Sequence, residues 1–199
     1  KDIRSPYSQW TDGFVRQRAQ VTEGGRKMTK ILRYIPDFAV LAVLYVLWLY
    51  PRWTRKGKRI LVVNTLMYVY LSGVLMVTLM PMITSLPLWF HHPYIPMHMV
   101  PFEDVLYGRG DYIRQIILNI FMMVPFGFLY PLCRRNAGKN CGLLRCLLAS
   151  LLLSLAIEVS QPLINGARSA DITDVITNTT GGALGYAVYA LFGRICGRL

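Results

Sequence analysis

Ionisable and amide side chains stand at the start of the last long apolar segment of this sequence. Residues 168–178 read RSADITDVITN and carry Arg168, Asp171, Asp174 and Asn178. A charged side chain at the centre of a bilayer costs about 2.5–3.5 kcal/mol, so such residues are expected to be paired, water-lined or functional. Carboxylates could hold a divalent cation through oxygen ligands. An arginine could bind a phosphate or carboxylate group with two hydrogen bonds.

Polar side chains with helical spacing occur on three successive apolar segments. They are Gln115 and Asn119 on the first, Ser154, Glu158, Gln161 and Asn165 on the second, and Asp171, Asp174 and Asn178 on the third. Side chains three or four residues apart share one face of a helix, and burying such faces against one another keeps them away from lipid. Because the intervening loop 164–173 is short, Glu158, Arg168 and Asp171 are expected to converge. Glu158 is the most informative acid, since it follows the uncharged run CLLASLLLSLAI.

Each member of this group also has a structural interpretation. Asp171 and Asp174 resemble a capping box at the start of a helix. Asn119 is expected to form an interhelical hydrogen bond, and the glycines Gly181, Gly182 and Gly185 are expected to permit close helix packing. The group taken together indicates a polar site more strongly than any member does. The candidate site has Glu158 and Asp171 as central groups, Arg168 and Asp174 as partners, and Asn119, Gln161 and Asn178 as hydrogen-bonding support.

The sequence contains no recognisable catalytic or metal-binding motif. His91, His92 and His98 have a poor spacing for zinc, and no two of the four cysteines form a C-x-x-C pair. No nucleophile–base pair is evident. We therefore favour a protein that is not an enzyme and has no resident cofactor or metal, with a divalent cation at the carboxylates as an open alternative.

Long uncharged runs must position these residues. The chain has 199 residues, of which 54% are hydrophobic. This pattern predicts an all-α, polytopic integral membrane helical bundle with four or five transmembrane helices. The expected spans are 34–50, 60–80, 113–132, 142–163 and 174–192. The first is barely long enough for the roughly 20 residues a span requires, and a re-entrant or interfacial hairpin is its alternative. Pro125, Phe126 and Gly127 are expected to kink or break the third.

The charge of +12 is expected to set membrane orientation rather than to bind nucleic acid. Lysines and arginines concentrate in loops 51–59 and 133–140, which predicts that these loops and the C-terminus are cytoplasmic. The long loop 81–111 and the loop 164–173 would then face outward. The polar segment 1–33 shows no cleavable signal peptide and holds eight basic residues. With five spans it would lie outside, so the side of the N-terminus stays open.

Three segments in order resemble the VanZ-like family of bacterial membrane proteins. They are NIFMMVPFGFLYPL, SLAIEVSQPL and RSADITDVITNTTGGALGY, and the MVPFEDV segment of the outer loop is similar as well. The resemblance covers about residues 60–192, which would form a VanZ-like membrane domain. Charge and hydropathy divide the rest of the chain into a basic N-terminal segment (1–33), a first apolar run with a cytoplasmic basic loop (34–59) and a C-terminal tail (193–199).

The resemblance implies a multi-pass protein of a Gram-positive-type plasma membrane. The founding member of the family is associated with low-level resistance to the glycopeptide teicoplanin, apart from the reprogramming of the peptidoglycan precursor. The expected partners are membrane lipids, with a lipid-linked cell-wall precursor or a lipoglycopeptide as candidate ligands. Two alternatives stay open. One is an enzyme or carrier for a lipid-linked phosphate or pyrophosphate, and the other is a purely structural membrane protein.

Overall fold

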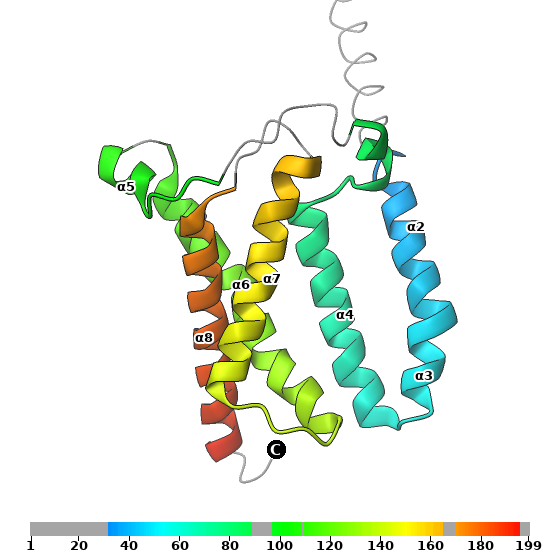
Figure 1. Ribbon diagram of the computed structural model, residues 1–199. Coiled ribbons are helices and arrows are strands. Elements are labelled where there is room, and N and C mark those ends of the chain that lie inside the picture. The colour runs from blue at the N-terminus through cyan, green and yellow to red at the C-terminus, as the bar shows by residue number, and fades with distance from the viewer. Residues whose placement is uncertain (1–31, 89–96, 109, 165–169, 196–199) are drawn as a thin grey trace, which may run out of the picture.

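The computed structural model describes residues 32–88, 97–108, 110–164 and 170–195, and these ranges form an antiparallel helical bundle (Figure 1). The elements are α2 (Ile35–Leu44), η1 (Tyr45–Leu49), α3 (Tyr50–Thr54), α4 (Lys58–Thr78), η2 (Ile83–Leu88), α5 (Glu103–Tyr107), α6 (Tyr112–Asn136), α7 (Leu143–Ile164) and α8 (Ile172–Ile195). Within the described ranges the one extended pairing is an isolated bridge between His98 and Asp171. The predicted all-α class is confirmed.

Four helical segments in these ranges are long and apolar enough to cross a membrane. They are Ile35–Thr54, Lys58–Thr78, Tyr112–Asn136 and Leu143–Ile164. The segment α8 has 24 residues, enough for a span, but its composition is more polar. It runs antiparallel to α7 (Figure 1), and three of its polar side chains, those of Thr173, Thr177 and Asn178, are buried in the bundle.

Several helices extend beyond their predicted ends. The first continues through η1 and α3 to Thr54, so the predicted basic loop 51–59 shortens to a turn before Lys58. The last begins at Ile172 and continues to Ile195, into the predicted tail. Ile35–Thr54 is thus a continuous helical stretch of 20 residues and reaches the length that a membrane span requires.

Helix α6 continues through its two prolines, so of the kink or break predicted at 125–127 the break is wrong. A proline leaves the carbonyl four residues earlier without its helical donor, and Pro131 does this to Gly127. The Cys146 thiol of α7 lies 3.6 Å from that carbonyl oxygen. One turn earlier, the Tyr70 hydroxyl of α4 donates to the Met122 carbonyl at 2.7 Å. Side chains of neighbouring helices therefore supply donors to the backbone around the prolines.

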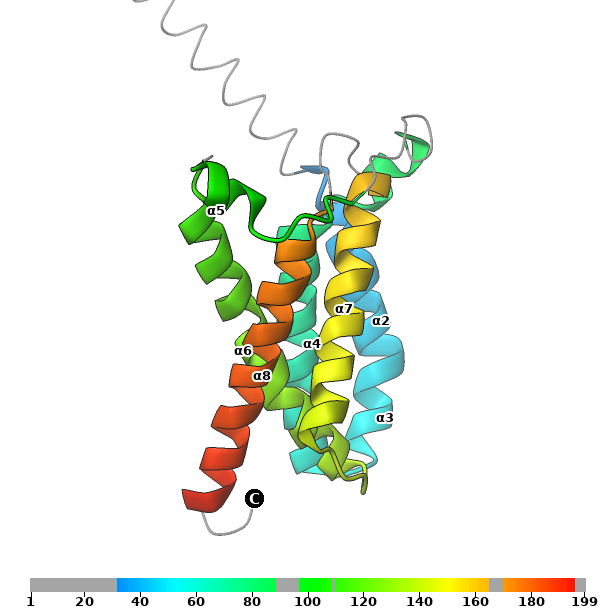
Figure 2. The ribbon, with the colours of Figure 1, turned by 60° about the vertical axis from the view of Figure 1, so that its left-hand side comes forward.

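Glycines hold α6 and α8 in close contact. A Cβ atom on Gly181 would collide with the Ile120 carbonyl, and one on Gly185 would collide with the Val124 carbonyl. Gly127 of α6 meets Gly182 in the same way. Small residues four apart allow helix backbones to approach, as in the small-xxx-small pattern of membrane helices. Figure 2 shows α6 crossing the bundle obliquely, and it packs against both α8 and α4.

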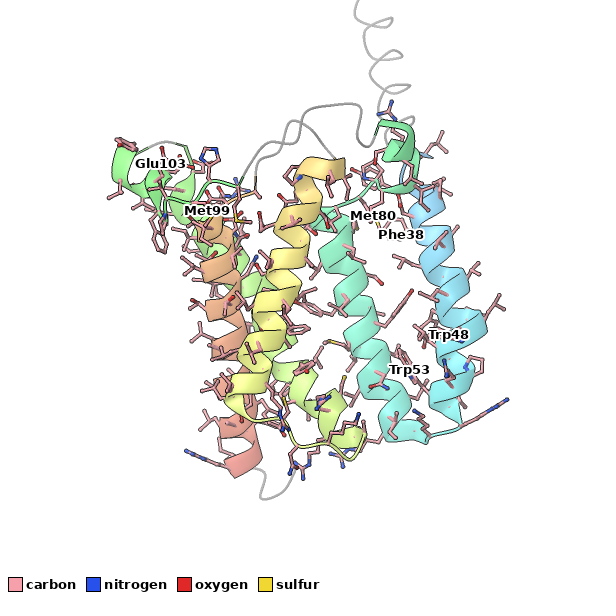
Figure 3. The ribbon with its side chains drawn as sticks, in the orientation of Figure 1. Phe38, Trp48, Trp53, Met80, Met99 and Glu103 are labelled. Carbon is pink, nitrogen blue, oxygen red and sulfur yellow. The ribbon has the colours of Figure 1, made fainter. Side chains whose placement is uncertain are left out.

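The acids of the described residues lie toward one end of the bundle, and most of the basic residues lie toward the other. Basic residues surround the α3–α4 and α6–α7 turns, which lie at the same end as the C-terminus of α8 (Figure 1). We call this the basic end. The described acids all lie toward the other end, called the acidic end: Asp37, Glu103, Asp104, Asp111, Glu158, Asp171 and Asp174. Figure 3 shows Glu103 and Met99 at the acidic end and Trp53 near the basic end. The loops predicted to face opposite sides of the membrane thus lie at opposite ends.

Asp37 anchors the first helix to the segment that follows α4. Its side chain is 5% exposed and accepts hydrogen bonds from the backbone N–H groups of Met82, at 3.2 Å, and Ile83, at 3.0 Å. We expect Asp37→Ala to lower the free energy of unfolding by about 1–3 kcal/mol, because two backbone donors would lose their acceptor. Thermal melting of the purified protein measures this loss.

The control for this prediction is Asp111→Ala. The Asp111 side chain is 86% exposed and lies 4.0 Å from Arg114, and exposed ion pairs of this kind contribute little. Equal melting temperatures for the two variants would contradict the anchoring role of Asp37.

Candidate functional site

Polar side chains of α6 and α8 meet at the acidic end. Asp174 lies in the first turn of α8, and its carboxylate faces two amides of α6. The Asn119 Nδ2 group donates to Asp174 Oδ1 at 2.7 Å, and the Gln115 Nε2 group lies 3.3 Å and 3.2 Å from the two carboxylate oxygens. The spacing of four residues between Gln115 and Asn119 aligns both amides on one face of α6. Asp174 therefore joins two helices, a contact that the capping interpretation did not include.

Asp171 and Glu158 join α7 to the start of α8. The Asp171 side chain caps α8, since its Oδ1 accepts the Thr173 N–H at 2.7 Å. The Asp171 backbone N–H lies 3.4 Å from Glu158 Oε2. Glu158 is only 2% exposed, so its carboxylate is enclosed by protein. The two acids singled out from the sequence are therefore neighbours.

A strand-like segment of the long loop crosses the start of α8. The His98 N–H donates to the Ala170 carbonyl at 2.8 Å, and the Ile172 N–H donates to the His98 carbonyl at 3.0 Å. The Phe102 N–H donates to Thr173 Oγ1 at 2.9 Å. These backbone bonds fix residues 98–102 beside the polar groups. Sequence reasoning missed the role of Thr173, although the MVPFEDV segment marked this part of the loop.

A second polar contact lies deeper between α7 and α8. Asn178, which is 1% exposed, donates from Nδ2 to Ser154 Oγ at 2.9 Å. Its Oδ1 atom is buried without a hydrogen-bond partner among the described residues. This contact fits the predicted helical stripe of polar residues on α7, and it stabilises the pairing of the two helices.

A groove between α4 and α6 opens at the acidic end and has a volume of about 1140 Å³. Its mouth carries Asp104, Asp111, Arg114, Gln115, Asn119, Gln161, Asp171 and Asp174. Its remaining lining is mainly apolar: Val69, Tyr70, Gly73, Val74, Val77, Thr78, Leu118, Phe121, Met122 and Pro125. Ligand pockets in proteins commonly enclose about 300–1,000 Å³ with a largely apolar lining and a few polar groups. The groove is slightly larger than this range and has the composition of a binding site.

The structure brings most of the candidate site residues together. Some of them line the groove, and others are buried in the bundle beside it. Asn119, Gln161, Asp171 and Asp174 line the groove, whereas Glu158 and Asn178 do not line it. Arg168 and Asn165 lie outside the described residues. Gly181, Gly182 and Gly185 contact α6 and α7 rather than the groove.

Two lining acids, Asp104 and Asp111, were missed in the sequence. The sign that could have found them is their position shortly before the start of α6, with Asp111 four residues before Gln115. The described side chains contain no group of three or more His, Cys, Asp or Glu arranged to hold a metal ion. A divalent cation therefore stays an untested alternative.

The helices and this polar site define a class: a polytopic helical membrane protein with a polar, acid-lined groove at one end. The model of the VanZ/LLP1 family matches residues 66–193, and the chain belongs to this family. The predicted resemblance is thus confirmed over α6, α7, α8 and most of α4, and it excludes α2 and α3.

A curated relative is Protein VanZ from Enterococcus faecium. It is 35% identical over 106 residues, which are 53% of this chain and 59% of the relative. The chain therefore covers less than two thirds of the length of that relative. No solved structure matches the chain.

Proposed function

We propose that this protein lies in a bacterial plasma membrane and lowers susceptibility to the glycopeptide teicoplanin through an outward-facing polar site at its acidic end. Membership of the VanZ/LLP1 family and similarity to Protein VanZ support the proposal. The distribution of charge supports the orientation, because lysine and arginine favour the cytoplasmic side of a membrane. The acidic end would then face the cell wall.

The observation that carries this proposal is the convergence of three helices on shared polar contacts. Asp171, directly before α8, donates its backbone N–H to Glu158 of α7, and Asp174 of α8 accepts a hydrogen bond from Asn119 of α6. Ionisable residues within membrane helices are rare because of their cost, and those that face the bundle interior or a water-filled cavity commonly mark a functional site. Groups placed in this way are suited to bind a polar ligand presented at the outer surface.

Removing the central charges tests this proposal. In a teicoplanin-sensitive host, we expect Glu158→Gln and Asp171→Asn each to return susceptibility to the level of cells that lack the protein. Both replacements keep the size of the side chain and remove its charge. The minimal inhibitory concentration of teicoplanin is the measurement, and membrane abundance is measured by immunoblot in parallel.

Glu103→Gln is the matched control, because Glu103 is an acid at the same end that does not line the groove. It is expected to keep the tolerance of the unmodified protein. Full tolerance in Glu158→Gln and Asp171→Asn at normal abundance would overturn the proposed site. A loss of tolerance that follows a loss of abundance would instead favour the structural alternative.

The electrostatics of the groove give less support to an enzyme or carrier for a lipid-linked phosphate. Its described lining carries four aspartates and one arginine, Arg114, which lies 4.0 Å from Asp111. An anionic phosphate at this mouth would meet like charges, which destabilise binding unless a cation bridges them. The groove therefore favours a ligand that is not anionic.

A further inference from the structure

We propose that the groove between α4 and α6 binds an outer-leaflet lipid with a net positive ammonium headgroup, its acyl chain lying along α4 and its ammonium group among the aspartates. This proposal rests on the proposed function, since it concerns the same outward-facing site. The shape and the charge of the groove indicate this chemical class of occupant.

The depth of the groove matches one leaflet of a bilayer. Its lining on α4 extends from Val69 to Thr78. At 1.5 Å per residue, this stretch is about 14 Å long. The hydrocarbon core of a bilayer is about 30 Å thick, so one leaflet contributes about 15 Å. An acyl chain that starts at the acidic end would therefore reach the bottom of the groove near the middle of the membrane.

The walls of the groove are apolar and accessible from the side. Val69, Val77, Leu118 and Phe121 are between 55% and 69% exposed, and all four line it. Gly73 lies among them, and a Cβ atom added there would meet nothing within 4 Å. A chain can therefore enter laterally from the lipid and lie against α4 without displacing protein atoms.

The mouth of the groove selects a positive headgroup. Asp104, Asp111, Asp171 and Asp174 line it, and Arg114 is the one basic residue of the described lining. Asp174 is held in place by Asn119 and Gln115, so its carboxylate is positioned in advance of binding. An ammonium group has three donors and no acceptor, which suits a set of carboxylates. A phosphate without a compensating amine would be repelled.

Binding of two detergent-like probes to the full chain tests the proposal. Hexadecylammonium and hexadecyl sulfate have the same chain and opposite charge, and isothermal titration calorimetry of the protein in a nonionic detergent measures both. We expect hexadecylammonium to bind about tenfold tighter or more, since hydrogen bonds between an ammonium group and carboxylates are stronger than those between neutral groups. The double variant Asp171→Asn with Asp174→Asn is expected to lose most of this preference.

A second variant tests the location of the chain. Gly73→Leu adds a side chain into open space in the groove, so we expect both probes to bind about tenfold weaker while the protein stays folded, because the chain would lose buried apolar contacts. Gly193→Leu is the matched control, because Gly193 also has open space around it and does not line the groove. It is expected to leave the affinities unchanged.

Four outcomes would overturn the proposal. Equal affinity for the two probes would remove the charge selectivity, and tighter binding of hexadecyl sulfate would assign the groove to an anionic lipid. A dimer, seen by light scattering, that dissociates in Gly73→Leu would assign it to a second copy of the chain. Undiminished binding in Gly73→Leu would place the probes elsewhere and would also count against it.

These binding results separate this proposal from the proposed function. If Gly73→Leu loses the probe but Glu158→Gln keeps full teicoplanin tolerance, the lipid groove stands and the proposed function fails. If the unmodified protein shows no preference for hexadecylammonium while Glu158→Gln loses tolerance, the proposed function stands and the lipid groove fails.

Discussion

Gly185→Ala is expected to remove most of the folded protein from the membrane. The added Cβ would collide with the Val124 carbonyl and would come within 2.8 Å of the Gly127 Cα and 2.9 Å of the Phe128 nitrogen. All three atoms belong to the backbone of α6, so no side chain can rotate away. Helix α6 itself must move, and overpacking of this kind commonly costs about 1–3 kcal/mol and occasionally more.

Gly193→Ala is the control for this prediction. Gly193 lies on the same helix, and its added Cβ would meet nothing within 4 Å. Both changes raise helix propensity by about 1 kcal/mol, so the difference between the variants isolates the contact with α6. Size-exclusion profiles and melting temperatures of the purified proteins measure it. Similar melting of the two variants would show that α6 and α8 are not held together by close backbone contact.

Asp174→Ala is expected to produce the second large loss of stability. The variant removes the acceptor of the Asn119 amide, at 2.7 Å, and of the Gln115 amide. Hydrogen bonds to a charged group contribute about 1.5–3 kcal/mol, and the two amides would lack their partner. The free energy of unfolding, from denaturant titration in detergent, should fall by about this amount.

A double-mutant cycle isolates the contact between the two helices. The coupling energy of Asp174→Ala with Asn119→Ala is expected to be about 1.5–3 kcal/mol, because the residues contact each other directly. Thr180→Ala on α8 is the control. Thr180 is exposed, and its hydroxyl donates to the Ile176 carbonyl of its own helix, so its coupling with Asn119→Ala should be near zero. A coupling near zero for Asp174 would mean that solvent replaces the bond.

The fold could be predicted largely from the sequence because long uncharged runs have few structural solutions in a membrane. The ends of the helices could not be predicted as well. Prolines indicated a break near Gly127, yet Tyr70 and Cys146 donate to α6 carbonyls there. Those donors come from helices distant in sequence, so spacing within α6 gives no sign of them.

The candidate site, too, could be predicted only in part. Helical spacing and a short loop were enough to predict that Glu158 and Asp171 lie together, because both are local properties of the chain. The groove depends on the distance between α4 and α6, which no local pattern determines. Asp104 and Asp111 become significant only when that distance is known, since they line the groove from α5 and from the residue before α6.

The pairing of α6 with α8 has a consequence for biosynthesis. Asn119 and Asp174 are 55 positions apart, and the whole of α7 lies between them. At about 5–20 residues per second, the ribosome would add Asp174 roughly 3–11 s after Asn119. During this interval the Asn119 amide must form its hydrogen bonds with water, with the insertion machinery or with a temporary partner. Nascent chains halted before Ile172 should therefore be the preferred clients of membrane chaperones and proteases.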